Sequence, residues 1–342
     1  MSRHGRQRRF PSAFWSALLA VAIAMLGLGG LFSVWKSRRL AELEAGSGLT
    51  LLPQGVMEFA ERGDGPVVLV LHGSPGGYDQ GFVYGEELLR RGFRVLSLSR
   101  PGYLRTPLET GATFAEQADA VSDLLTARGI TACGVLGVSE GAPCAMELAS
   151  RHPEQVSAMV LLSPPGASLG YPPIASIGYR LFHDLTGDLG CWFLSLRAAW
   201  SPRQLFADMA GTASSLRPSG REGIAGFVMR DPRQQDFLKG LALSITPLSP
   251  REHGIINDNA QLKDLPPAAS FRIRCPLLVL TGEHAASTPF EALRKRFSAI
   301  PGSRLEVIPE VGHILPVGAR FAGCWDGISA FLKAPPAPRP AP

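Results

Sequence analysis

The chain has 342 residues, of which 45% are hydrophobic and 18% are charged, a balance that excludes an intrinsically disordered protein. The formal net charge is +5, and the excess lies near the N-terminus, ahead of the first acidic residue. The remainder is therefore close to neutral, which argues against a nucleic-acid partner. The basic residues in question are Arg3, Arg6, Arg8, Arg9, Lys36, Arg38 and Arg39.

An uncharged stretch, residues 14–35, follows a basic N-terminal segment at residues 1–13. As a helix this stretch would be about 33 Å long, enough to cross a bilayer. Trp15 and Trp35 stand at its ends, and indole rings favour the membrane interface. We expect a single-pass transmembrane anchor that is retained. A cleaved signal peptide and a buried helix of a soluble protein are the alternatives.

The charges on either side of this span bear on its orientation. Four arginines precede it and three basic residues follow it, a narrow difference that favours a cytoplasmic N-terminus. The bulk of the protein, with any catalytic domain, would then be extracytoplasmic. Residues 36–53 are expected to form a linker, with Gly46-Ser47-Gly48 as its flexible part.

Strands and helices alternate over residues 54–163, which predicts an α/β fold with a mainly parallel sheet flanked by helices. Thr113 and Glu116 form a capping-box pattern at the start of one of these helices. Apolar runs predict buried strands at residues 67–71, 93–98, 133–138 and 156–162. Helices are expected at residues 79–91, 113–128 and 142–151.

The alternation stops after residue 163 and resumes near residue 270. Residues 164–269 contain several prolines and helical stretches rich in aromatic residues, but no run typical of a buried strand. We therefore expect an inserted helical lid there. Residues 270–333 complete the core with two strands and two helices, and the Ala/Pro-rich residues 334–342 are expected to be a disordered tail.

The segment Gly137-Val138-Ser139-Glu140-Gly141 fits the pattern G-x-S-x-G between a predicted strand and a predicted helix. This is the context of a nucleophile elbow, in which a serine stands at the tip of a strained turn. Side chains at Gly137 and Gly141 would clash where the strand and the helix approach each other. Ser139 is therefore the candidate nucleophile, at a helix N-terminus that favours an oxyanion.

Three further motifs lie around this turn in a recognisable order. His72-Gly73-Ser74-Pro75-Gly76 follows an earlier strand, Ser99-Arg100-Pro101-Gly102-Tyr103 follows the next, and Val311-Gly312-His313 follows the last. Over residues 54–333 the chain thus resembles the α/β-hydrolase fold superfamily, and its HG-x-PG loop is similar to that of proline-iminopeptidase-like and ester hydrolases.

The resemblance implies roles for several residues. A serine hydroxyl needs a base, and His313, in a loop after the last strand, stands where this fold carries it. The backbone amides of Ser74 and Glu140 would form the oxyanion hole. His72 and Gly73 would support the loop that carries the first of these amides.

The usual third member of the triad is missing. The family carries an aspartate after the second-last strand, and Ala285 occupies that place in this chain. An alanine cannot orient the imidazole or stabilise its protonated form. Glu283, two residues earlier, and Asp258, near the end of the insertion, are the candidate replacements. The remaining alternative is a weakened site that binds without turnover.

We therefore predict a membrane-anchored serine hydrolase that cleaves an ester or amide through an acyl-enzyme on Ser139. The apolar content of the lid favours a small, lipophilic substrate. The chain has no phosphate-binding loop, dinucleotide fingerprint or C-x-x-C pair, so we expect no cofactor and no metal. The second hypothesis, motivated by Ala285, is a hydrolase-like binding or scaffold protein.

Overall fold

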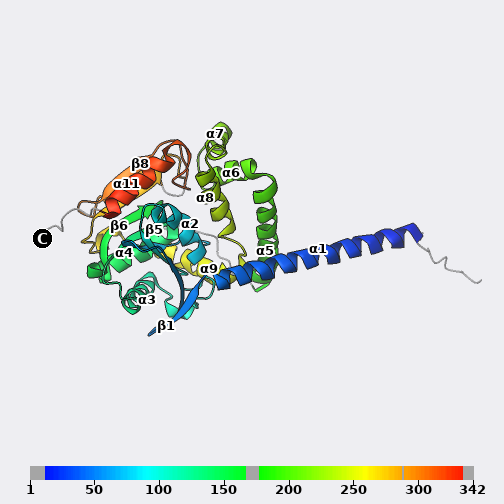
Figure 1. The fold of residues 1–342 in the computed structure, drawn as a ribbon, viewed down its shortest axis with the longest axis horizontal. Coiled ribbons are helices and arrows are strands. Elements are labelled where there is room, and N and C mark those ends of the chain that lie inside the picture. The colour runs from blue at the N-terminus through cyan, green and yellow to red at the C-terminus, as the bar shows by residue number, and fades with distance from the viewer. Residues whose placement is uncertain (1–11, 167–176, 287–288, 334–342) are drawn as a thin grey trace, which may run out of the picture.

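A sheet of eight strands runs through the part of the chain that the computed structural model describes, residues 12–166, 177–286 and 289–333 (Figure 1). The strands are β1 Gly48–Leu52, β2 Gly55–Arg62, β3 Val67–Leu71, β4 Arg94–Leu98, β5 Cys133–Val138, β6 Val156–Leu162, β7 Leu277–Gly282 and β8 Arg304–Ile308. Their order is β1-β2-β4-β3-β5-β6-β7-β8. Strand β2 pairs antiparallel with β1 and β4, and the other pairs are parallel, so the predicted mainly parallel sheet is confirmed.

Helices cover both faces of this sheet. The helices of the described residues are α1 Ser12–Ala45, α2 Tyr78–Leu89, α3 Phe114–Ala127, α4 Ala142–Arg151, α5 Ile177–Trp200, α6 Pro202–Gly211, α7 Pro218–Val228, α8 Pro232–Leu243, α9 Glu252–Gln261, α10 Phe290–Phe297 and α11 Phe321–Lys333. Helices α2 and α11 pack on one face, and α3, α4 and α10 pack on the other. Helices α5 to α9 occupy the described part of residues 164–269, which confirms the predicted helical insertion.

The central strands contribute side chains to a hydrophobic cluster on each face. In β3, Val68 and Val70 pack in the cluster below α2 and α11. Leu69 and Leu71 pack in the cluster below α3 and α4. Because both faces of the strand are covered, every position in it is apolar. This explains why β3 reads in the sequence as a continuous apolar run.

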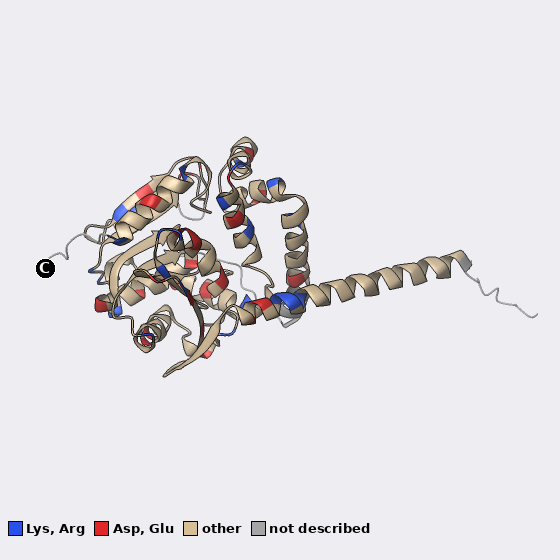
Figure 2. Cartoon of the chain, viewed as in Figure 1, with Lys and Arg blue, Asp and Glu red and all other residues tan. Residues whose placement is uncertain are grey.

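Helix α1 projects away from the sheet, and its apolar part is exposed (Figure 1). Figure 2 shows no charge along this helix until its base. From Ala13 to Ala45 it is long and apolar enough to cross a membrane, a property that membrane anchors share with signal sequences. Most of the expected basic segment, residues 1–11, and the expected tail, residues 334–342, lie outside the described residues.

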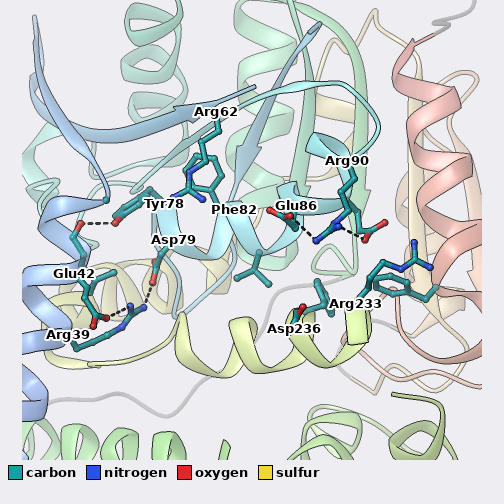
Figure 3. A pocket seen from close by; sticks show the side chains of 16 residues that line it. Arg39, Glu42, Arg62, Tyr78, Asp79, Phe82, Glu86, Arg90, Arg233 and Asp236 are labelled. Atoms are coloured by element: carbon teal, nitrogen blue, oxygen red, sulfur yellow. Dashed lines mark hydrogen bonds and ion pairs between the residues drawn. The ribbon is translucent and has the colours of Figure 1, made fainter. Parts of the chain in front are cut away.

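The base of α1 occupies part of the expected linker, residues 36–53. The helix continues into this segment and β1 follows it closely. Two contacts hold the helix against α2 (Figure 3). Arg39 Nη2 lies 3.1 Å from Asp79 Oδ2, and the Tyr78 hydroxyl donates to the Leu43 carbonyl oxygen at 2.6 Å. The expected linker is therefore helical up to Ala45, and residues distant in sequence fix this part, whereas its expected flexible part, Gly46-Ser47-Gly48, follows the helix.

The predicted capping box at the start of α3 is formed, and its contribution to stability can be tested. The Thr113 side chain accepts from the Glu116 amide, and the Glu116 carboxylate accepts from the Thr113 amide. We expect Thr113→Ala to lower the free energy of unfolding by about 1 kcal/mol. Urea denaturation in mild detergent would measure this. Thr126→Ala, in the last turn of the same helix, is the control, and an equal loss there would contradict the assignment.

Candidate active site

Ser139 lies at the tip of the sharp turn between β5 and α4. Its φ is +46°, a strained value for a residue with a side chain. A Cβ atom at Gly141 would overlap the carbonyl oxygens of Leu71 and His72. One at Gly137 would lie 2.9 Å from the Leu161 side chain. Gly141 is thus required where the turn meets the end of β3, whereas the closest contact at Gly137 is the end of a flexible leucine side chain and the clash expected there is weaker.

His313 lies beside this serine. Its Nε2 atom is 3.2 Å from Ser139 Oγ, a distance suitable for proton transfer between them. The Ser163 hydroxyl donates to the His313 carbonyl oxygen at 2.7 Å and so fixes the backbone of the histidine. Burial lowers the pKa of His313, and the Glu140 carboxylate opposes this shift. The imidazole is therefore held in the neutral form that can accept a proton.

The loop after β3 is braced by His72. Its Nε2 atom accepts from the Arg100 amide at 2.9 Å, so the ring proton resides on Nδ1. Nδ1 then donates to the Gly73 carbonyl oxygen at 2.8 Å. Burial lowers the pKa of His72 most, the Arg100 charge lowers it further, and the ring therefore stays neutral. These bonds give His72 and Gly73 the supporting place that the resemblance implies.

The Glu140 side chain occupies an unexpected position. Its Oε2 atom accepts from the Ser74 amide at 3.0 Å, and that amide is one of the two expected oxyanion donors. Sequence reasoning assigned Glu140 only a backbone role. No motif predicts where its carboxylate points, although an acidic residue directly after the candidate nucleophile is visible in the sequence. A carbonyl oxygen entering here must displace this carboxylate from Ser74.

Neither candidate acid lies at His313. Among the described residues, no hydrogen bond joins the carboxylate of Glu283 or Asp258 to this histidine, and neither residue lines the cavity that holds it. Glu283 accepts instead from the Glu310 amide at 3.0 Å. Ala285, at the usual acid position, is buried.

Asp258 has a structural role instead. It is 1% exposed, and its two oxygens lie 2.8 and 2.5 Å from the Arg100 guanidinium. The Tyr103 hydroxyl donates to the same carboxylate at 2.6 Å. Three hydrogen bonds thus hold this carboxylate in place and tie α9 to the loop after β4. Asp258 is a candidate replacement acid beside His313 in the sequence, but its carboxylate pairs with Arg100 instead.

A cavity of about 440 Å³ opens above Ser139 and His313. The sheet side supplies Ser74 and Glu140, and the lid helices supply most of the apolar wall. Such a pocket suits a ligand with an apolar group and one polar centre to be bound near the serine. The apolar lining residues are Pro75, Val138, Leu162, Pro165, Leu194, Leu205, Met209, Ala213, Leu241, Ala242, Ile245, Ile314 and Leu315.

Comparisons with known proteins agree with this arrangement. A family model described as the alpha/beta hydrolase fold matches residues 66–179, the segment that carries the HG-x-PG loop and the serine turn. A solved structure of an alpha/beta hydrolase fold protein from Nakamurella multipartita superimposes with a TM-score of 0.76. It is 29% identical in sequence, and the match covers 84% of this chain and 99% of that chain.

The matches to two curated relatives cover most of the length of each relative. The hydrolase YcgS of Bacillus subtilis is 24% identical over 301 residues, 82% of this chain and 96% of the relative. A pimeloyl-[acyl-carrier protein] methyl ester esterase from Chromobacterium violaceum is 27% identical over 256 residues, 73% of this chain and 88% of the relative. The chain is thus similar to hydrolases, an esterase among them.

The structural role of Asp258 can be separated from a catalytic one. Asp258→Asn leaves the buried Arg100 guanidinium without its counter-charge, which we expect to cost about 3–5 kcal/mol of unfolding free energy. Glu283 is exposed, so Glu283→Gln is the matched control and should change the free energy of unfolding little. Denaturant unfolding measures both. Unchanged stability in Asp258→Asn would contradict the structural assignment.

The pKa of His313 predicts the pH dependence of activity. A histidine whose pKa is lowered stays neutral at pH 6.5, where an ordinary histidine is half protonated. The acid limb of kcat/KM for 4-nitrophenyl acetate should therefore have its midpoint below pH 6.5. Glu140→Gln removes the charge that raises this pKa and should move the midpoint lower still. A midpoint above 6.5, or an upward shift in the variant, would refute the interpretation.

Proposed function

Because this chain belongs to the α/β-hydrolase fold superfamily, we propose that it is a membrane-anchored serine hydrolase that cleaves an ester or amide with an apolar acyl group. The observation that carries the proposal is the 3.2 Å separation of Ser139 Oγ and His313 Nε2 at the floor of an apolar cavity. An activated hydroxyl beside a lipophilic pocket suits acyl transfer.

The reaction follows from this geometry. Ser139 Oγ attacks the substrate carbonyl carbon while His313 takes its proton, and the carbonyl oxygen becomes an oxyanion. The amides of Ser74 and Glu140 bind that oxyanion once the Glu140 carboxylate has left Ser74. His313 then gives its proton to the departing alcohol or amine. Water, deprotonated by His313, attacks the acyl-enzyme and releases the acid and the free serine.

Stabilisation of the protonated His313 needs a negative charge, which an acid normally supplies. Glu140 raises the pKa of His313 and so favours its protonated form. We infer that Glu140 contributes part of what the aspartate replaced by Ala285 would give. Its carboxylate would then have two effects: it covers the Ser74 amide at rest and stabilises the imidazolium during turnover.

The ester preference is drawn from the relatives. The relative from Chromobacterium violaceum is named for a methyl ester that it cleaves. We extend a preference for ester bonds to this chain because both proteins cover the same core. The apolar wall of the cavity adds a preference for aliphatic acyl groups.

We further propose that α1 is a retained single-pass anchor and that the catalytic domain is extracytoplasmic. Cleavage after a signal sequence would remove the base of the helix along with its contacts. Those contacts include the ion pair between Lys36 and the buried Asp188, at 2.7 Å, and the pair between Arg39 and Asp79. A helix so tightly built into the domain is better explained as a permanent part of it.

The catalytic proposal is tested by labelling the full chain with a fluorophosphonate probe, which reacts with activated serines. We expect Ser139 to be labelled, and Ser139→Ala to abolish labelling and to lower kcat for 4-nitrophenyl butyrate by at least about 10³-fold. Labelling that persists in Ser139→Ala would place the reactive serine elsewhere.

A second candidate function is supported by the buried Ala285 and by the other partners of Glu283 and Asp258. These features suit a hydrolase-like binding protein. Folded protein that the probe does not label, together with activity gained by orders of magnitude in Ala285→Asp, would favour this second function over the first.

A further inference from the structure

Helix α5 lies across the base of the apolar part of α1 (Figure 1). The rings of Phe32 and Trp192 are 5.9 Å apart, and Lys36 Nζ lies 2.7 Å from Asp188 Oδ2. Phe32 belongs to the uncharged span, and Lys36 is the first charge after it. The contact therefore places α5 at the level where the span of α1 meets the membrane surface.

The outward face of α5 carries two large aromatic side chains, with Arg197, whose side chain is 43% exposed and paired with Asp208, between them. Phe193 is 58% exposed and Trp200 is 79% exposed, and they stand seven residues apart, which puts them on one side of the helix. Leu196, half-buried, lies between them on the same side. Large aromatic side chains exposed together are costly in water, and tryptophan favours the interface of a bilayer.

Neighbouring residues of the same helix line the cavity above Ser139. Leu194 and Arg197 both contribute to its wall, whereas Phe193 and Trp200 do not. A single helix thus contributes to the proposed acyl pocket and also carries exposed aromatic side chains beside the span of α1.

We propose that the α5 face formed by Phe193, Leu196 and Trp200 lies in the interface of the bilayer that α1 spans. The cavity then takes its substrate from that bilayer, and the substrate class is a membrane-resident ester with a long acyl chain. This inference rests on the proposed function for the anchor and for the hydrolysis. It adds the surface that meets the lipid and the source of the substrate.

The position of α5 is tested by fluorescence quenching, which needs no catalysis. The full chain is reconstituted in vesicles of palmitoyl-oleoyl phosphatidylcholine, with or without brominated acyl chains, and compared with Trp200→Phe. The difference spectrum isolates Trp200. We expect brominated lipid to reduce its emission about threefold, as for an indole at the acyl boundary. No quenching of Trp200 would overturn the proposal.

Quenching also separates this inference from the anchor itself. If the remaining tryptophans are quenched while Trp200 is not, the anchor stands and the α5 surface is wrong. If no tryptophan is quenched, both the proposed membrane anchor and the proposed contact of α5 with the bilayer are refuted. Cross-linking of Phe193→Cys between two copies, together with an unquenched Trp200, would assign the face to a second copy of the chain instead.

Substrate delivery is tested with the double variant Phe193→Ser/Trp200→Ser. We expect kcat/KM for 4-nitrophenyl palmitate carried in these vesicles to fall about tenfold, while kcat/KM for 4-nitrophenyl acetate in water is unchanged. Leu51→Ser is the control, since Leu51 is 81% exposed on β1, away from α5 (Figure 1). Equal palmitate hydrolysis by wild type and double variant would refute the delivery route. Absence of Ser139-dependent acetate hydrolysis would refute the proposed function instead.

Discussion

The close approach of the serine turn to the end of β3 determines most of the site. Gly141 lies against the carbonyl oxygens of Leu71 and His72, and two residues earlier the backbone of Ser139 turns at a positive φ of +46°. The same approach puts the loop after β3 beside Ser139, with Gly73 close to the serine side chain and His313 Nε2 3.2 Å from its hydroxyl. The strained backbone conformation of Ser139 persists because the strands packed around it leave the chain no room to relax.

The sequence predicted those features that depend on local pattern. The continuous apolar run of β3, the two glycines of the turn and the capping box of α3 each have one physical explanation, and the structure contains all three. Their evidence lies within a few residues. The order of the motifs along the chain was enough to bring Ser139 and His313 together.

The sequence failed where distant side chains decide the outcome. Residues 36–45 are expected from the sequence to belong to a linker, yet they continue α1, and Asp79 and Tyr78 hold them from another part of the chain. Asp258 reads as a spare carboxylate because no local pattern shows that Arg100 binds it. A buried guanidinium is costly unless a carboxylate pairs with it. Asp258 pairs with Arg100 and therefore does not lie beside His313.

One carboxylate links α1 with the loop after β3. Asp79 binds Arg39 of α1 and Arg251, and the Arg251 guanidinium also donates to the carbonyl oxygen of Gly76 at 2.6 Å. Helix α1 therefore supports, through Asp79 and Arg251, the loop after β3 that contains Ser74. A chain cut after Ala45 would lose this support, whereas a chain cut before Lys36 would lose the exposed apolar part of α1 and keep the contact between Arg39 and Asp79.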